Sequence, residues 1–227
     1  MAEKATWIST FTRFRPGRIP LIGPIVVLVA DWSRPQSGHG PMFDRGLLER
    51  LSCADPRWIV ALYGSLSLVL LWDGWRVGLS PSSIAMRYVA GFLVWTLVEY
   101  IAHRVSFHHT PTTTRQVAYG YLVHGVHHAY PDDSRRWVMP LTVTMPIATV
   151  LVAIVWLGAG SPGFPALAGF LHGYLTYDLL HYFIHRGRMP TRLGRYLRAY
   201  HMQHHYAAPD RHFGVSSPLW DVVFRTR

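Results

Sequence analysis

The sequence predicts an all-α integral membrane protein with about four transmembrane helices in two hairpins, capped by a cytosolic helical domain that holds a dinuclear histidine metal site. Three observations lead to this fold class. Half of the 227 residues are hydrophobic and only 15% are charged, a balance typical of membrane proteins. No Asp, Glu, Lys or Arg occurs from Trp137 to Tyr177. Histidines gather in short segments beside the long apolar ones.

The charge and cysteine content exclude several classes of protein. The formal net charge is +10, but the basic residues fall between apolar runs and follow no nucleic-acid-binding motif, so we expect no nucleic acid partner. Anionic lipid headgroups are the expected counterpart. Cys53 is the only cysteine, which excludes an intrachain disulfide and a cysteine-based zinc or iron–sulfur site.

Residues 1–56 are expected to form an N-terminal interfacial segment, which precedes a membrane and metal-binding domain over residues 57–227. The apolar stretch from Ile19 to Ala30 is too short to cross a bilayer and contains Pro20 and Pro24, so we interpret it as interfacial. The first 18 residues lack the apolar core of a secretory signal peptide.

The first predicted hairpin consists of spans near residues 58–78 and 83–101. The apolar run from Trp58 to Trp72 is short for a bilayer that needs about 20 residues, so this helix is expected to continue past Asp73. Pro81 opens the second span, because proline is well tolerated in the first turn of a helix.

The second predicted hairpin consists of spans near residues 138–157 and 163–180, which the Gly- and Pro-rich residues 158–163 separate. An intervening hairpin returns the histidine regions, residues 103–136 and 181–227, to the same side of the membrane. Most arginines between and after the spans lie on that side, and the positive-inside bias places it in the cytoplasm. These arginines are Arg104, Arg115, Arg135, Arg136, Arg186, Arg188, Arg192, Arg195 and Arg198.

Ten histidines in four short segments are the candidate metal ligands. They are His103, His108, His124, His127, His128, His181, His185, His201, His204 and His205. Most are spaced by three or four residues, which places them on one face of a helix. Imidazole suits iron, zinc and copper, and ten rings can fill the coordination of two ions.

Two details of these segments lead to further expectations. His103 and His108 are five residues apart, so the helix between them is expected to end or distort. Glu99 and Asp178 precede His103 and His181 by four and three residues. We therefore expect each carboxylate to accept the other ring N–H of its histidine.

The pattern resembles the membrane-bound fatty acid hydroxylase superfamily, which includes sterol desaturases and sterol methyl oxidases. The matching histidine segments are His103-Arg-Val-Ser-Phe-His108, His124-Gly-Val-His127-His128, His181-Tyr-Phe-Ile-His185 and His201-Met-Gln-His204-His205. Phe107-His108-His109, the extension to Ala-Tyr-Pro-Asp132, Tyr177-Asp178 and Phe213-Gly-Val-Ser-Ser-Pro-Leu-Trp-Asp221 are similar to the sphingolipid fatty acid 2-hydroxylase branch. The resemblance covers residues from about Leu93 to the end of the sequence.

This resemblance implies an oxidoreductase that uses O2 and two electrons to hydroxylate a membrane lipid. The expected reaction is 2-hydroxylation of a fatty acyl chain, either a free fatty acid or the N-acyl chain of a sphingolipid. The ten histidines would hold two metal ions, with iron as the working metal and zinc able to occupy the site in purified protein. Tyr177 and Asp178 are the candidate catalytic residues beside the third histidine segment. Tyr177 would line the lipid entrance or orient the substrate.

The resemblance also raises the question of the electron source. Residues 1–55 have neither the length nor the haem-ligand spacing of a cytochrome b5 domain. Electrons are therefore expected from a separate carrier, such as a cytochrome b5 or a ferredoxin, attracted to the basic cytosolic face.

Two alternatives remain open at the level of sequence. The same centre can serve an oxygenase that acts on a sterol, a carotenoid or an aminolipid headgroup, since cavity shape sets substrate choice. The chain can also be a non-catalytic membrane metal-binding protein, which variable metal loading would distinguish from a fixed two ions per chain. The sequence does not allocate the ten ligands between two ions.

Overall fold

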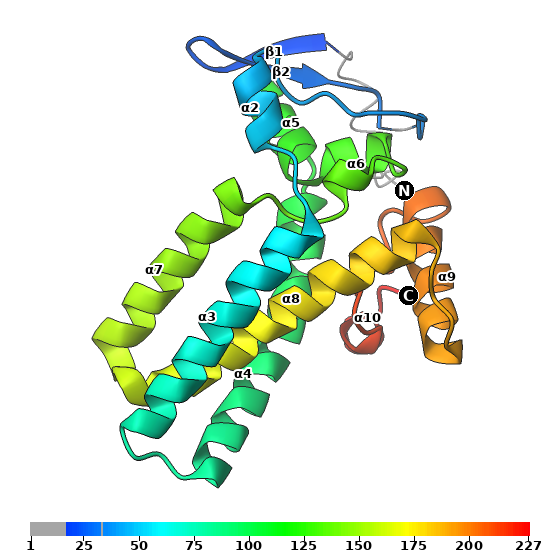
Figure 1. Ribbon diagram of the computed structural model, residues 1–227. Coiled ribbons are helices and arrows are strands. Elements are labelled where there is room, and N and C mark those ends of the chain that lie inside the picture. The colour runs from blue at the N-terminus through cyan, green and yellow to red at the C-terminus, as the bar shows by residue number, and fades with distance from the viewer. Residues whose placement is uncertain (1–16, 33) are drawn as a thin grey trace.

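The structure is a computed structural model that describes residues 17–32 and 34–227. Four long helices pack into a bundle, and short helices with a two-stranded sheet cover one end of it (Figure 1). The long helices are α3 (Pro56–Arg76), α4 (Pro81–Ile101), α7 (Leu141–Ala159) and α8 (Phe164–Arg186).

Local capping explains where the long helices begin and end. Asp55 accepts a hydrogen bond from the backbone N–H of Arg57 at the start of α3, and Ser80 does the same for Ser83 at the start of α4. Gly160 follows α7 with a φ of 61°, and Gly187 follows α8 with a φ of 75°. These backbone conformations favour glycine, so both helices end at the residue that permits the turn.

Among the residues that the structure describes, three helical segments are long and apolar enough to cross a membrane: Pro56–Arg76, Pro81–Phe107 and Ser134–Ala159. They match the first three predicted spans. The fourth predicted span, near residues 163–180, is not among these three. Most of it lies in α8, the central helix, which packs against both α3 and α4. This helix carries buried polar side chains, including Asp178 and His181. Because its neighbours in the bundle cover it, α8 does not need to be apolar on every face.

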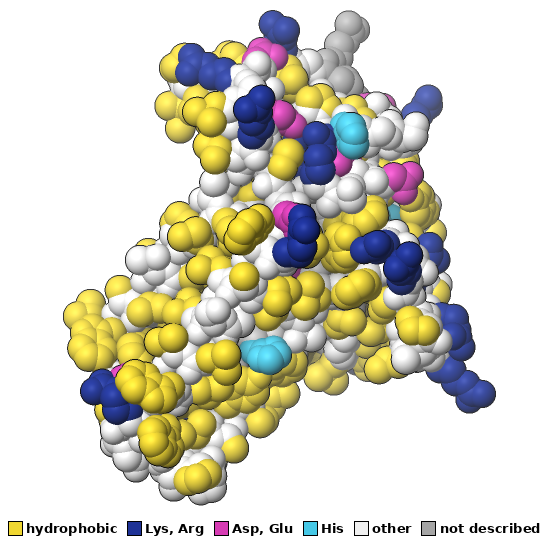
Figure 2. All heavy atoms as spheres, in the orientation of Figure 1, with side chains coloured by type: hydrophobic (Ala, Val, Ile, Leu, Met, Phe, Trp, Pro, Cys, Tyr) yellow, Lys and Arg dark blue, Asp and Glu magenta, His cyan; other side chains and the backbone are white. Residues whose placement is uncertain are grey.

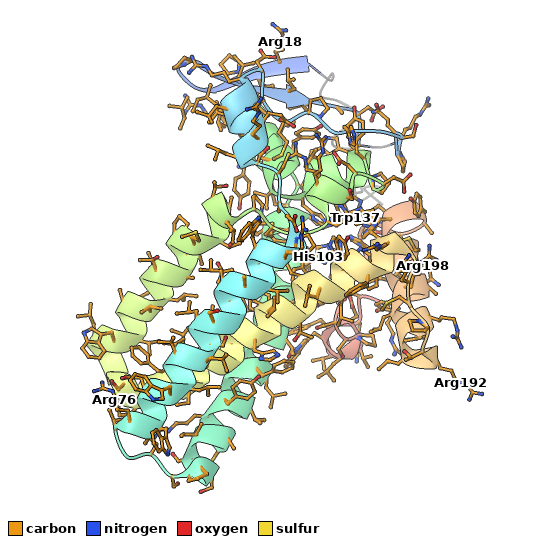
Figure 3. All side chains as sticks on the ribbon, viewed as in Figure 1. Arg18, Arg76, His103, Trp137, Arg192 and Arg198 are labelled. Atoms are coloured by element: carbon orange, nitrogen blue, oxygen red, sulfur yellow. The ribbon has the colours of Figure 1, made fainter. Side chains whose placement is uncertain are left out.

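The surface of the long helices is largely hydrophobic (Figure 2). Along α7, Ile147, Val150, Ile154 and Leu157 are exposed, the last by 84%. Exposed apolar side chains on one long helix indicate contact with lipid. Arg76 lies at the far end of α3 from His103, whereas Arg192 and Arg198 lie at the histidine end (Figure 3).

The prediction of an all-α chain is wrong for residues near the N-terminus, although the chain is mostly helical. Strands β1 (Gly17–Ile22) and β2 (Ile25–Val29) form an antiparallel pair. Pro20 and Pro24 disfavour a helix here, and the β-branched residues of both strands suit a pleated surface. Val27 and Val29 are buried beside Trp32 and Met42, so this sheet packs on the short helices. Residues 1–16 of the predicted interfacial segment lie outside the described residues.

The remaining elements are short, and all of them except η4 form the cap over the histidine end. They are α2 (Gly46–Leu51), π-helix η1 (Ala102–Phe107), α5 (Thr114–Gly120), π-helix η2 (Tyr121–Gly125), α6 (Val126–Ala129), η3 (Ser134–Arg136), η4 (Ser161–Gly163), α9 (Arg192–Tyr206) and α10 (Leu219–Val223). Of these, η4 lies at the opposite end, where it joins α7 to α8. The cap therefore comes from three separate parts of the chain.

Candidate metal centre

All ten predicted histidines converge in one buried region where α8 meets the cap. Nine are buried and His185 is partly buried. His103 lies in η1 and His108 follows it directly, His124 lies in η2, and the other seven lie on α6, α8 and α9. The predicted meeting of four histidine segments is therefore confirmed.

The histidines form two groups of five, an allocation that the sequence left open. In each group, one ring nitrogen from every residue lies within 4.8 Å of the others, an arrangement that can hold a metal ion. The first group is His103, His108, His124, His128 and His204, and the second is His127, His181, His185, His201 and His205. Adjacent residues His127 and His128 thus belong to different groups.

The nitrogen spacings fit metal ligation. In the first group, the Nε2 atom of His124 lies 3.1 Å from that of His103 and 3.0 Å from that of His128. In the second, the Nε2 atom of His201 lies 3.0 Å from that of His185 and 3.1 Å from that of His205. Two nitrogens held at right angles about 2.1 Å from one ion lie about 3.0 Å apart.

Hydrogen bonding alone cannot satisfy these rings. A neutral imidazole has one N–H and one acceptor nitrogen, so an Nε2 atom that faces two other Nε2 atoms cannot pair with both. In the second group, the buried Nε2 atom of His181 has no hydrogen-bond partner. A bound cation would use these lone pairs together, and this is the observation that supports two metal ions.

Two π-helices bring irregularly spaced histidines together. The backbone N–H of His108 donates to the carbonyl of His103, 3.1 Å away, which is the five-residue turn of a π-helix. The predicted distortion between these two residues is confirmed. The second π-helix ends at Gly125, where an added Cβ would lie 2.1 Å from the Trp32 ring, so glycine permits close packing of the N-terminal segment on this turn.

Backbone carbonyls orient several of the rings. The Nδ1 atom of His103 bonds the carbonyl of Phe213 at 2.5 Å, that of His181 the carbonyl of Trp137 at 2.6 Å, and that of His204 the carbonyl of Arg211 at 2.6 Å. A carbonyl only accepts, so Nδ1 must carry the proton and Nε2 keeps the lone pair. Each of these rings thereby presents Nε2 to its group.

The predicted partners of His103 and His181 are wrong. Glu99 accepts hydrogen bonds from the backbone N–H groups of Val215 and Ser216, both at 2.9 Å. Asp178 accepts from the Tyr174 hydroxyl at 2.6 Å. The physical reason is that buried backbone N–H groups need acceptors. Glu99 satisfies two of them on the loop that supplies a carbonyl to His103.

Asp178 and Asp221 each hold a loop whose carbonyl orients a histidine. Asp178 accepts from the N–H of Met139 at 3.4 Å, two residues after Trp137. Buried Asp221 accepts from the N–H groups of Phe213 and Gly214, at 3.0 and 2.8 Å. Sequence reasoning assigned no role to Asp221. Its place in the Phe213–Asp221 motif was the only signal in the sequence that could have identified it.

Burial keeps the histidines of the cap neutral. It lowers the pKa of His204 to about 3 and holds the pKa of His128 well below its usual range. Removal from water disfavours the charged imidazolium, so at neutral pH each of these rings keeps one unprotonated nitrogen. Neutral imidazole is the form that binds a metal ion.

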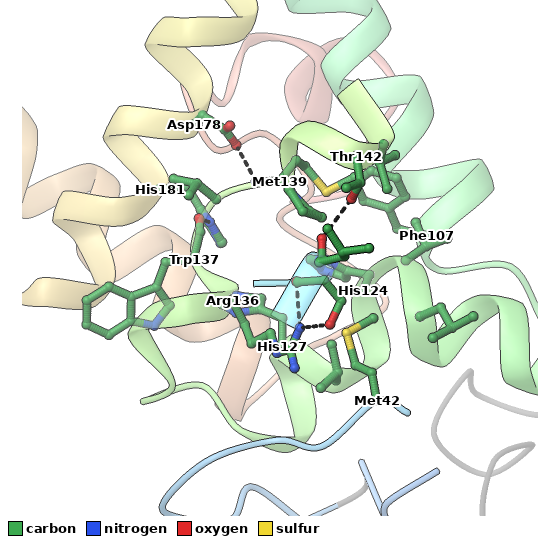
Figure 4. Close-up of a pocket in the computed structure, with 18 of the residues that line it drawn as sticks. Met42, Phe107, His124, His127, Arg136, Trp137, Met139, Thr142, Asp178 and His181 are labelled. Carbon is green, nitrogen blue, oxygen red and sulfur yellow. Dashed lines mark hydrogen bonds between the residues drawn. The ribbon is translucent and has the colours of Figure 1, made fainter. Parts of the chain in front are cut away.

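An apolar cavity of about 390 Å³ adjoins both histidine groups (Figure 4). His124 of the first group and His127 and His181 of the second line it, as do Tyr177 and Asp178. Tyr177 is buried, and its ring is parallel to that of His181 to within 10°, with 6.0 Å between centroids. Both predicted catalytic residues therefore lie beside the histidine groups. A mostly apolar pocket with a few polar groups is typical of a ligand site.

Comparisons with known proteins agree with this geometry. The sequence model of the family named fatty acid hydroxylase matches residues 88–226. The chain is 39% identical over 151 residues to the dihydroceramide fatty acyl 2-hydroxylase FAH2 of Arabidopsis thaliana, with 66% of this chain and 63% of the relative covered. It is 37% identical to the ceramide very long chain fatty acid hydroxylase scs7 of Schizosaccharomyces pombe, with 64% of this chain and 44% of the relative covered. The chain thus spans less than two thirds of the length of these relatives.

A solved structure described as full length scs7p, with only the hydroxylase domain visible, superposes with a TM-score of 0.79 at 30% identity. The superposition covers 86% of this chain and 76% of that one.

Proposed function

Because the chain belongs to the fatty acid hydroxylase family, we propose that it is an O2-dependent membrane lipid hydroxylase that acts on the 2-position of a fatty acyl chain. The observation that carries this proposal is the contact of two five-histidine groups with one apolar cavity. The relatives named above act on ceramide or dihydroceramide acyl chains. A free fatty acid or the N-acyl chain of a sphingolipid is therefore the proposed substrate.

The ten histidines are the proposed ligands of two iron ions. Iron would supply the O2 activation and electron transfer of the reaction, which zinc cannot supply because it has no redox chemistry. The protein holds the rings neutral, directs Nε2 atoms inward and surrounds the groups with apolar side chains. Zinc in the same positions would give a folded but inactive protein.

The position of the acyl carbonyl would decide which carbon is hydroxylated. An acyl chain in the cavity is surrounded by apolar side chains, while its polar end is retained near the membrane surface. A fixed depth of the carbonyl then places the next carbon beside the histidine groups, and such positioning can supply a large part of a rate enhancement. The apolar lining of the cavity disfavours a polar headgroup as the part of the substrate that enters it.

Tyr177 and Asp178 have different proposed roles. Tyr177 lines the cavity against His181 and would contact the acyl chain and orient it. Asp178 fixes the backbone of Met139 and the hydroxyl of Tyr174, so it is a positioning residue for the cavity wall. Tyr177→Phe would keep the ring and its packing, and Tyr177→Ala would remove the guide for the chain.

We further propose that residues 57–227 form the hydroxylase domain, with α3, α4, α7 and α8 embedded in the membrane and the histidine cap in the cytosol. The arginines at the histidine end support this orientation. Electrons would come from a separate carrier, and the basic surface of the cap suits an acidic one such as a cytochrome b5 or a ferredoxin.

The test is reconstitution with iron under anaerobic conditions, followed by O2, a chemical reductant and a panel of ceramides and free fatty acids. Mass spectrometry should detect products with one added oxygen at carbon 2. The His127→Ala/His128→Ala variant should lose both metal and product. Hydroxylation by this variant, or the absence of acyl hydroxylation by an iron-loaded wild type with two ions per chain, would refute the proposal.

A further inference from the structure

One wall of the cavity comes from a part of the chain that precedes the family match at residue 88. The lining residues there are Met42, Phe43, Leu48, Leu51 and Ser52, from α2 and the residues on either side of it. The opposite walls come from the cap helices, from the first turn of α7 and from α8. The N-terminal segment, which had no predicted task beyond interfacial docking, therefore contributes directly to the site.

Exposure along the cavity wall shows where it opens. At the histidine end, His124, His127 and Met42 are at most 6% exposed. At the other end, Leu51 of α2 and Tyr119 of α5 are each 46% exposed, and Val143 of α7 is 43% exposed. The exposed part of the cavity wall therefore includes α2, α5 and the first turn of α7.

This opening lies at the level where α7 enters the membrane. The helix begins at Leu141, and its exposed residues from Val143 onward are apolar. The hydroxyl of Thr142 donates to the carbonyl of Leu51 at 2.8 Å, which joins the end of α2 to the start of α7. A bilayer lipid can reach such an opening sideways, with its headgroup still at the interface.

A buried arginine fixes this wall relative to the histidines. Arg136 donates to the carbonyl of Ser52 at 2.6 Å and to that of Gly40 at 3.0 Å, and it pairs with Glu49. Figure 4 shows Arg136 among the residues that line the cavity. Asp133 accepts from the N–H of Gly40 at 3.0 Å. Asp133 and Arg136, in the turn after α6, therefore hold the N-terminal wall at Gly40 and at Ser52.

We infer that α2 and the first turn of α7 form a lateral entrance from the bilayer, and that Leu48 at this entrance limits the bulk of the acyl chain that reaches the histidines. The inference rests on the proposed function, because it assigns the cavity to an acyl chain. Leu48 lines the cavity, whereas its neighbour Leu47 is 70% exposed and does not line it. The two leucines form a matched pair for a test.

The experiment uses the full chain, loaded with zinc so that no turnover occurs, in phosphatidylcholine nanodiscs. The probe is a ceramide whose N-acyl chain carries a diazirine, and the labelled peptides are identified by mass spectrometry. In the wild type, excess unlabelled ceramide should displace labelling of residues 42–51 and 138–143. Leu48→Trp should reduce this labelling about tenfold, since excluding two methylenes has about that effect on affinity. Leu47→Trp should leave it unchanged.

Equal labelling of the Leu48→Trp variant and the wild type would overturn the inference, as would an equal loss in Leu47→Trp. If Leu48→Trp does not retain its two metals, Leu48→Ala decides. That variant should raise the labelling by a methyl-branched probe relative to the straight-chain probe, and an unchanged ratio is a negative result. Iron-dependent hydroxylation with labelling elsewhere refutes only the entrance. No displaceable labelling together with no hydroxylation refutes the proposed function itself.

Discussion

At the scale of single residues, the site depends on which ring nitrogen each histidine presents. Backbone carbonyls of Phe213, Trp137 and Arg211 each take an Nδ1 hydrogen bond. Buried carboxylates act one step further away, on the loops that carry such carbonyls. A change at Glu99 would therefore displace His103 through the loop, with no direct contact between the two side chains.

The allocation of adjacent histidines to different groups leads to a first prediction. His128→Ala should lower the metal affinity of the first group, and His127→Ala should lower that of the second. Each loss should exceed the roughly 10–100-fold that is typical when a ligand loses a hydrogen-bond partner outside the metal site. Metal content measured by elemental mass spectrometry should fall from two ions toward one in each variant and toward none in the double variant.

His109→Ala is the control, because the ring nitrogens of His109 face the backbone carbonyls of Ser106 and Gln116 and the residue belongs to neither histidine group. This variant should keep two ions. If His109→Ala lost as much metal as His128→Ala, the grouping would be wrong.

The lowered pKa of His204 leads to a second prediction, on pH. The ordinary pKa of histidine is 6.5, and in the folded protein the pKa of His204 is about 3. Between these two pH values, His204 is protonated in the unfolded chain but not in the folded protein. Protonation therefore favours unfolding, and the free energy of unfolding falls as pH is lowered between these values, by about 1.4 kcal/mol per pH unit for this group. The Tm and the bound metal should both decrease from pH 7.5 to pH 5. A Tm that stayed constant over this range would contradict the prediction.

At the scale of elements, α8 is held very close to α4. A Cβ added to Gly169 would lie 1.9 Å from the Tyr88 carbonyl oxygen, and one added to Gly91 would lie 1.8 Å from the Ala166 carbonyl oxygen. These reciprocal contacts let two backbones touch, as small residues commonly do between membrane helices. Because α8 also carries His181 and His185, this packing fixes where two histidines of the second group lie along the axis of the bundle.

Gly169→Ala should therefore destabilise the protein by about 3 kcal/mol, since α4 has to move away to accommodate the methyl group. Thermal unfolding in detergent measures this change, and metal content should fall with it. Gly64→Ala on α3 is the matched control, because nothing lies within 4 Å of the added Cβ there. This control should be neutral or slightly stabilising. Similar Tm values for the two variants would show that the helices are not in close contact at Gly169.

Much of the helical architecture could be predicted, because long apolar runs with Pro and Gly at their ends define membrane helices. The histidine spacings identified all ten residues of the two groups. The hairpin of β1 and β2 was missed because its apolar run is short and its fold depends on packing against Trp32 and Met42. The partners of Glu99 were missed because they lie more than 110 residues away in sequence, where spacing carries no information.

At the scale of the whole molecule, the two histidine groups join parts of the chain that are otherwise connected by loops. The histidines come from η1 and the residue after it, from η2 and α6, from α8 and from α9. Bound ions would therefore cross-link the membrane bundle to the cap. Without them, buried nitrogens such as Nε2 of His181 lack partners, and unsatisfied buried polar groups are destabilising.

Removal of metal should consequently loosen the cap before the bundle. After treatment with a chelator, hydrogen exchange should accelerate in α6 and α9, while α3 and the apolar half of α4 keep their protection. Restoring zinc should reverse the change. Uniform acceleration across all helices, or none in α9, would show that the ions do not join the two parts.

The presence of α9 ligands in both groups has a consequence for biogenesis. His204 belongs to the first group, and His201 and His205 belong to the second. The first group is therefore complete only after residue 204 has left the ribosome, and the second only after residue 205. His103 must wait for a partner about a hundred positions downstream, and the closure of so long a loop is a late event in folding. On the proposed function, we therefore expect insertion of the helices into the bilayer to precede capture of the ions, so that the nascent chain passes through an inserted stage without metal.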